Sequence, residues 1–146
     1  MNRLHPKLLP LLVVFALAGA ALVPVAAAVS PTLTGTITAD KAVYKQGDTV
    51  TLHYLVGGAV PHGGQPAIYL ACYFNGGYDS AYWNVPDYPT DPRFSGSPTL
   101  PSGTVTWKAV IRSTYRGTAE CYAYLFIDTL QHHYYRLAEA EFDVGS

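Results

Sequence analysis

Aromatic side chains are the residues of this 146-residue chain most suited to recognition chemistry, and they are dense between Gly76 and Pro101. Aspartates alternate with these rings, and prolines stiffen the backbone around them. A flat ring beside a carboxylate suits stacking on a sugar whose hydroxyl groups are hydrogen-bonded, and it equally suits a protein contact. The segment therefore predicts a binding loop with the candidate contact residues Tyr78, Tyr82, Trp83 and Tyr88.

Metal binding and catalysis have weaker support in the sequence. Asp79, Asp87 and Asp91 could supply oxygen ligands, but their spacing is not that of an established calcium loop and Pro92 restricts the backbone. The histidines have no ligand spacing relative to the cysteines. No serine-hydrolase, zinc-protease, phosphate-loop or dinucleotide fingerprint occurs. We therefore expect a non-enzymatic protein with no catalytic residues, no metal and no cofactor.

The amino terminus has the order of a secretory signal peptide. Arg3 and Lys7 precede an uncharged apolar run from Leu8 to Val25, and small residues follow up to Ala28. The run is close to the ~20 residues that span a bilayer, so a retained membrane anchor is the alternative. We expect a hydrophobic signal helix over residues 1–28, cleavage after Ala28, and a single extracellular or cell-surface domain over residues 29–146.

Removal of that segment makes the remaining chain acidic. Arg3 and Lys7 leave with it, so seven of the nine Lys and Arg residues remain against ten Asp and Glu, a net charge of minus three. No basic stripe remains that could follow a phosphate backbone, and nucleic acid is therefore not an expected partner.

Two cysteines lie in the exported part, Cys72 and Cys121. Two cysteines in a protein outside the reducing cytosol most often form a disulfide, which here would close a loop of about 49 residues. Two buried thiols or a metal pair are the alternatives, and the metal pair lacks further cysteine ligands.

From Leu33 onward the chain reads as short strands separated by Gly, Pro, Asn and Asp, with no window of helical period. Residues 49–56 and 104–112 alternate apolar with polar side chains, as strands with one buried face do. Further strands are expected at 33–40, 67–74, 80–85, 118–128 and 134–144. About seven strands joined by turns predict an all-β fold, an antiparallel sandwich.

Two short motifs, Tyr44 to Leu52 and Arg116 to Tyr124, resemble those of extracellular immunoglobulin-like (Ig-like) domains, including macroglobulin-type modules. Tyr44, the turn at Gly47, and Val50 with Leu52 are similar to the passage from the first to the second strand of such domains. The resemblance implies an Ig-like β-sandwich over most of residues 33–144 and implies no particular activity.

The second motif, Arg116 to Tyr124, is similar to the Gly-x-Tyr-x-Cys start of the penultimate Ig strand. Gly117 and Cys121 match, whereas Ala119 replaces the tyrosine. The first cysteine also departs from the family pattern, because Cys72 falls on the third predicted strand, where antibody-type domains have a tryptophan.

Strand alternation predicts where the remaining aromatic residues point. The two cysteines share a face with Ile68, Leu70, Leu125 and Ile127, so this face is expected to line the core. The opposite face should then be exposed to solvent, although its side chains are aromatic. These side chains are Tyr69, Tyr73, Tyr122, Tyr124 and Phe126. If the last strand lies alongside, Tyr135 and Leu137 join them. Such a surface usually marks a contact site unless the segment 76–101 folds back over it.

Two functions are consistent with these features. The first is a structural or adhesive subunit that uses the aromatic face and edge strands to contact a protein partner or copies of itself; residues 29–40 would then pair with a neighbouring sheet edge, or else form an ordinary first strand. The second is a monomeric module that binds carbohydrate or protein through the loop 76–101. Membrane contact is expected only through an uncleaved amino-terminal segment.

Overall fold

The computed structural model describes residues 32–85, 91–99, 101–111, 116–131 and 133–145, and these residues form an all-β protein. The predicted signal segment 1–28 lies outside them. Nine strands are present in the described residues: β1 (Thr34–Ala39), β2 (Val43–Lys45), β3 (Thr49–Gly57), β4 (Gln65–Phe74), β5 (Gly77–Asn84), β6 (Phe94–Ser95), β7 (Ser102–Lys108), β8 (Thr118–Asp128) and β9 (Tyr134–Gly145). The prediction of an all-β fold is confirmed, and the two strands absent from it are the short β2 and β6.

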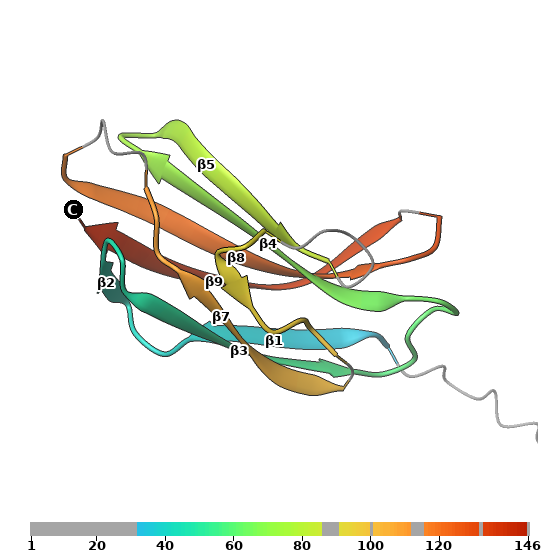
Figure 1. Cartoon of the computed structure of the whole chain (residues 1–146). Helices are drawn as coiled ribbons and strands as arrows, with labels where there is room; N and C mark the ends of the chain where they lie inside the picture. Colours follow the sequence, from blue (N-terminus) through green and yellow to red (C-terminus); the bar gives the residue numbers. More distant parts are fainter. Residues whose placement is uncertain (1–31, 86–90, 100, 112–115, 132, 146) are drawn as a thin grey trace, which may run out of the picture.

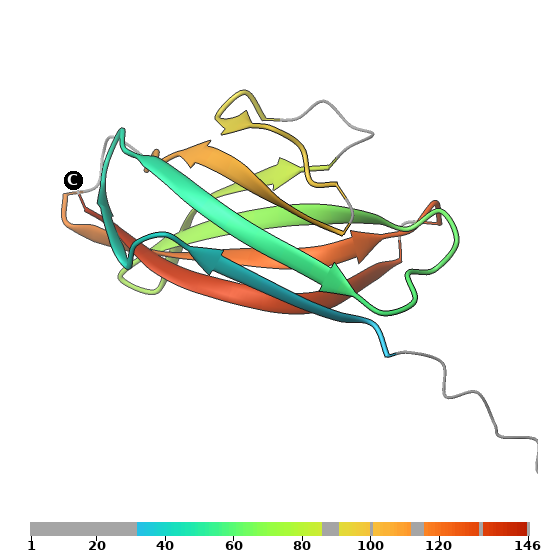
Figure 2. The same cartoon turned by 90° about the horizontal axis from the view of Figure 1, so that it is seen from below.

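The strands form two sheets that lie in two layers (Figure 1 and Figure 2). The order is β1-β3-β7-β6 in the four-stranded sheet and β2-β9-β8-β4-β5 in the five-stranded sheet. Neighbouring strands are antiparallel except β2 and β9, which run parallel. In the part of the chain that the structure describes there is no helix, and thus none long and apolar enough to cross a membrane.

The core lies between the two sheets and follows from the alternation along the strands. In β3 the buried residues Val50, Leu52, Tyr54 and Val56 alternate with more exposed ones, as the sequence predicts. From the same sheet, Trp107 on β7 is fully buried, and its indole lies 6.3 Å from the ring of Phe142 on β9 in the opposite sheet. Large apolar side chains from both layers therefore interlock in one cluster.

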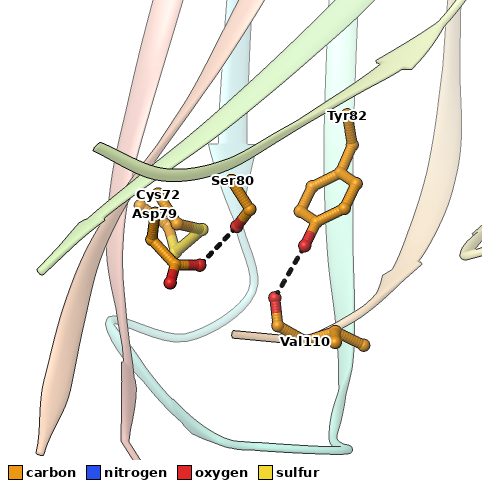
Figure 3. The surroundings of a disulfide bond; sticks show 6 residues. Cys72, Asp79, Ser80, Tyr82 and Val110 are labelled. Carbon is orange, nitrogen blue, oxygen red and sulfur yellow. Dashed lines mark hydrogen bonds between the residues drawn. A yellow bond between two sulfur atoms is a disulfide. The ribbon is translucent and has the colours of Figure 1, made fainter. Parts of the chain in front are cut away.

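The described residues of the segment 76–101 contain more regular structure than the one strand expected at 80–85. Residues 77–84 form β5, and Tyr82 on this strand is buried, with its hydroxyl donating to the carbonyl of Val110 at 3.0 Å (Figure 3). Phe94 is also buried, in β6, which pairs with β7 of the other sheet. The described residues of this segment thus cross between the layers, and β5 extends the five-stranded sheet at its edge.

Cys72 and Cys121 form a disulfide in the structure, and both are fully buried on the core side (Figure 3). They sit directly opposite each other on β4 and β8, so the bond joins neighbouring strands of one sheet. Closing a loop across 49 residues of sequence stabilises the fold by roughly 4 kcal/mol on the chain-entropy estimate.

A tyrosine and an aspartate fix the point where the chain leaves β1 for β2. The hydroxyl of Tyr44 donates to Asp40, and it accepts from the backbone N–H of Lys41 at 2.9 Å. Asp40 also accepts the N–H of Thr51 at 3.0 Å. Burial raises the pKa of Tyr44 to about 12, and the hydrogen bond from Tyr44 is the main cause that lowers the pKa of Asp40.

Replacing Tyr44 by Phe tests this pair, because the ring stays and the hydroxyl goes. The folded pKa of Tyr44 lies above its ordinary value of 10.0, so its contribution is complete below pH 10 and is lost as pH rises to about 12. The folded pKa of Asp40 lies below 3.8, so its contribution is lost as pH falls through that range. In urea titrations we expect Tyr44→Phe to be about 1 kcal/mol less stable at neutral pH. The difference from the wild type should shrink at both extremes; a difference independent of pH would contradict the assignment.

Candidate functional site

The outer face of the five-stranded sheet carries a continuous layer of aromatic rings. Because the cysteines face the core, the alternate positions of β4 and β8 face outward. The structure places all five predicted residues there, each partly exposed: Tyr69 and Tyr73 on β4, and Tyr122, Tyr124 and Phe126 on β8. β5 adds Trp83, which is 43% exposed, and Tyr78, and β9 adds Tyr134. These eight residues are called the aromatic face below.

Ring contacts connect the aromatic face from strand to strand. Trp83 lies 4.3 Å from Tyr69 between ring centroids, and Tyr69 lies 6.0 Å from Tyr124 with the two planes 20° apart. Tyr124 continues to Tyr122 at 6.3 Å, and Tyr122 meets Tyr73 edge-on at 5.9 Å. Aromatic pairs of this kind each contribute about 0.5–1.5 kcal/mol beyond area burial, so the rings are held in a defined arrangement.

Two alanines lie beneath the rings. Ala67 and Ala71 point outward from β4, in phase with Tyr69 and Tyr73, yet neither is exposed. Ala71 is paired with Tyr122, and Ala67 with Phe126. Larger side chains therefore close over the small ones, and the aromatic face forms a thin second apolar layer outside the sheet.

Two β-bulges turn further residues onto the aromatic face. In β5, the register shifts so that Tyr78 pairs with Tyr73, while Asp79 becomes the extra residue. Asp79 is fully buried and accepts a hydrogen bond from Ser80 Oγ at 2.6 Å, close to Cys72 (Figure 3). Without the bulge, Asp79 would have the outward phase and Tyr78 the inward one.

The second bulge lies in β9 between the partners of Leu125 and Phe126. Phe126 pairs with Arg136, so Tyr134 and Arg136 take the outward phase in place of Tyr135 and Leu137. Leu137 instead packs against the core. The prediction that Tyr135 and Leu137 join the aromatic face is wrong because strict alternation across this stretch takes no account of an inserted residue.

Carboxylates border the aromatic face along β9 and the start of β8. Glu120 pairs with Asp143, Tyr122 with Glu141, and Tyr124 with Glu139. Glu120 and Asp143 are like charges placed directly opposite each other, which disfavours the folded state. Burial raises the pKa of the Tyr122 hydroxyl, and the charges of Glu141 and Glu120 raise it further. This border therefore concentrates negative charge beside the rings.

A guanidinium already rests on the aromatic face. Arg136 Cζ lies 4.5 Å from the centroid of the Tyr124 ring, and the same side chain forms an ion pair with Glu139. A cation above a tyrosine ring is attracted by the negative π face. Together, the ring and the carboxylate can accept a positively charged planar group.

The other predicted contact residues are placed differently. Tyr82 lies in the core and not on a binding loop, so its proposed contact role is wrong, and Tyr88 lies outside the described residues. Within the described ranges, no group of three or more His, Cys, Asp or Glu side chains could hold a metal ion. Sequence reasoning missed Tyr134, Arg136 and the carboxylate border; the alternating acidic residues from Glu139 to Asp143 were the signal available.

Comparisons with known proteins give little further information. No protein-family model matches the chain, and no curated protein matches it. Among solved structures, it is similar to the Pseudomonas fluorescens alkylpurine DNA glycosylase AlkC bound to DNA containing an abasic site analog. The identity is 13% and the TM-score 0.41, over 80% of this chain and 31% of that chain.

That neighbour is described as an enzyme bound to DNA, which is contrary to three predictions from the sequence. The first prediction is that the protein is an adhesive subunit or, alternatively, a module that binds through the loop 76–101. The second is that the protein is not an enzyme, and the third is that nucleic acid is not a partner. The three predictions are withdrawn in the form stated above. A similarity of this size carries no argument about activity, so neither glycosylase activity nor DNA binding is transferred to this chain.

The carboxylate border makes a prediction for Tyr122. Replacing Glu141 by Gln removes a neighbouring negative charge, so we expect the pKa of Tyr122 to fall toward its ordinary value of 10.0. The measurement is a pH titration of the tyrosine Cζ resonance by NMR. Glu139→Gln, one step along the same edge of β9, is the matched control. An unchanged Tyr122 titration in Glu141→Gln would show that the carboxylate does not act on this ring.

Proposed function

We propose that the chain is an exported Ig-like β-sandwich whose aromatic face binds a cationic segment of a polypeptide, rich in arginine. The observation that carries the proposal is that partly exposed rings lie on the same sheet face as the carboxylates of Glu120 and Asp143, which are directly opposite each other across β8 and β9. This site differs from the binding loop that the sequence suggested, because it lies on the strands β4, β5, β8 and β9.

The strand order supports the Ig-like part of the proposal. Ig domains pair strands A-B-E-D in one sheet and G-F-C in the other. Here β1-β3-β7-β6 and β9-β8-β4 have the corresponding chain order, with β5 added at one edge of the second sheet and the short β2 at the other. The disulfide departs from the antibody arrangement, because it joins β4 to β8 within one sheet.

Export is supported by the signal-like residues 1–28 and by a disulfide, which persists in oxidising compartments. The intact mass of the mature protein, before and after reduction, tests both at once. We expect a chain that starts at Val29 and gains two hydrogens on reduction. A mature chain that retained Met1, or a mass unchanged by reduction, would contradict the corresponding part.

Charge favours a cation over a neutral ligand at the aromatic face. A sugar could stack on the rings, but it would leave the repulsion between Glu120 and Asp143 in place. A guanidinium or ammonium group would relieve that repulsion and would also gain about 0.5–1 kcal/mol from each exposed ring that it covers. Arginine adds stacking and a two-pronged contact with a carboxylate, which a lysine ammonium lacks.

Binding of a labelled octa-arginine peptide, followed by fluorescence anisotropy, tests the proposal. We expect Trp83→Ala and Tyr124→Ala each to weaken binding about two- to fivefold, because each removes one exposed ring from the aromatic face. Tyr135→Ala is the matched control, since Tyr135 is 46% exposed but has the opposite phase on β9. Affinity should also fall as salt is added.

Three outcomes would overturn the proposal. The first is no binding of octa-arginine by the wild type at low salt. The second is an equal loss in Tyr135→Ala and Trp83→Ala. The third is preferential binding of a neutral oligosaccharide or of single-stranded DNA, either of which would assign the aromatic face to another class of ligand.

A further inference from the structure

Arg136 lies in the position that a ligand guanidinium would take. Its Cζ stands 4.5 Å above the Tyr124 ring, and its ion pair uses Glu139, the carboxylate directly opposite Tyr124 across β8 and β9. The side chain therefore occupies at once the ring and the carboxylate that the proposed ligand needs.

The backbone directs Arg136 to this position. The bulge at Leu137 gives Arg136 the outward phase and pairs it with Phe126, two residues along β8 from Tyr124. The guanidinium then reaches back along the sheet to Tyr124 and to Glu139, three residues later in its own strand. Bulges often re-aim a side chain beside a functional site.

The contacts of Arg136 are weak enough to be exchanged. Its side chain is 53% exposed and that of Glu139 is 34% exposed. Water therefore competes for the ion pair, and exposed pairs of this kind contribute little to folding. Releasing Arg136 leaves the apolar layer over Ala67 and Ala71 intact, because Arg136 contributes no ring to it.

We propose that Arg136 is an internal competitor at the aromatic face: it covers Tyr124 and Glu139 in the free protein and is displaced by an arginine of the bound polypeptide. This inference rests on the proposed function, because it concerns regulation of the same site. A ligand with a single cationic group would only replace the contacts that Arg136 already makes, so its binding would gain little free energy. A segment with several arginines gains contacts to Trp83 and to the carboxylate border as well.

Arg93 provides a matched control. Its Cζ lies 4.6 Å from the ring of Tyr82, and it pairs with Asp91 at 2.8 Å. Arg93 thus has the same two kinds of contact as Arg136, but its ring partner belongs to the core and not to the aromatic face. Arg136→Gln and Arg93→Gln also remove the same charge, so a general effect of net charge appears equally in both.

The test compares octa-arginine binding to the wild type, Arg136→Gln, Arg136→Lys and Arg93→Gln, with thermal unfolding as a check that each variant is folded. We expect Arg136→Gln to bind about three- to tenfold more tightly than the wild type, since the ligand no longer displaces a stacked and paired cation. Arg136→Lys, which keeps the charge and loses the planar stacking, should fall between them. Arg93→Gln should match the wild type.

The outcomes separate this inference from the proposed function. If the wild type binds octa-arginine and loses affinity in Trp83→Ala, but Arg136→Gln binds no more tightly, the aromatic face is the site and the competitor role is wrong. Equal gains in Arg136→Gln and Arg93→Gln would reduce the effect to net charge and would also overturn the inference. If no variant binds the peptide, both proposals fail.

Discussion

The inward direction of Cys72 and Cys121 is the constraint on which the rest of the molecule depends. The two residues face each other across β4 and β8, and a covalent bond between them excludes a slip of either strand by one position. Such a slip would exchange the two faces of the strand. With the register fixed, Ile68, Leu70 and Leu125 stay in the core, and the tyrosines between them stay outside.

The two bulges change the alternation of inward and outward side chains in β5 and β9, the strands that flank β4 and β8. In β5 the bulge buries the carboxylate of Asp79 and turns Tyr78 outward. In β9 it packs the partly buried Leu137 against the core and turns Arg136 outward. Both irregularities thus enlarge the same surface. The aromatic face is a product of regular alternation in the middle strands and of local departures from it at the flanking strands.

Sequence reasoning predicted those parts that depend on local pattern. Alternation along residues 49–56 and 118–128 was sufficient to assign β3 and β8 and to separate their inner from their outer residues. It failed where one residue is inserted, since a bulge leaves no mark in a hydrophobic pattern of period two. It predicted a strand at 80–85 but missed the start of β5, because Gly76 and Gly77 indicate a turn although pairing with β4 begins at Gly77. The contact of Arg136 with Tyr124 depends on which strands are neighbours, and no short segment contains that information.

The alanines beneath the rings have a consequence for the way the molecule opens. β4 has partners on both edges, β5 and β8, and side chains cover both of its faces: the core on one side, the aromatic face on the other. Solvent can reach its amide groups only when both layers separate together. Its amide protons should therefore exchange with deuterium only through global unfolding, so that their protection reports the free energy of unfolding of the whole protein.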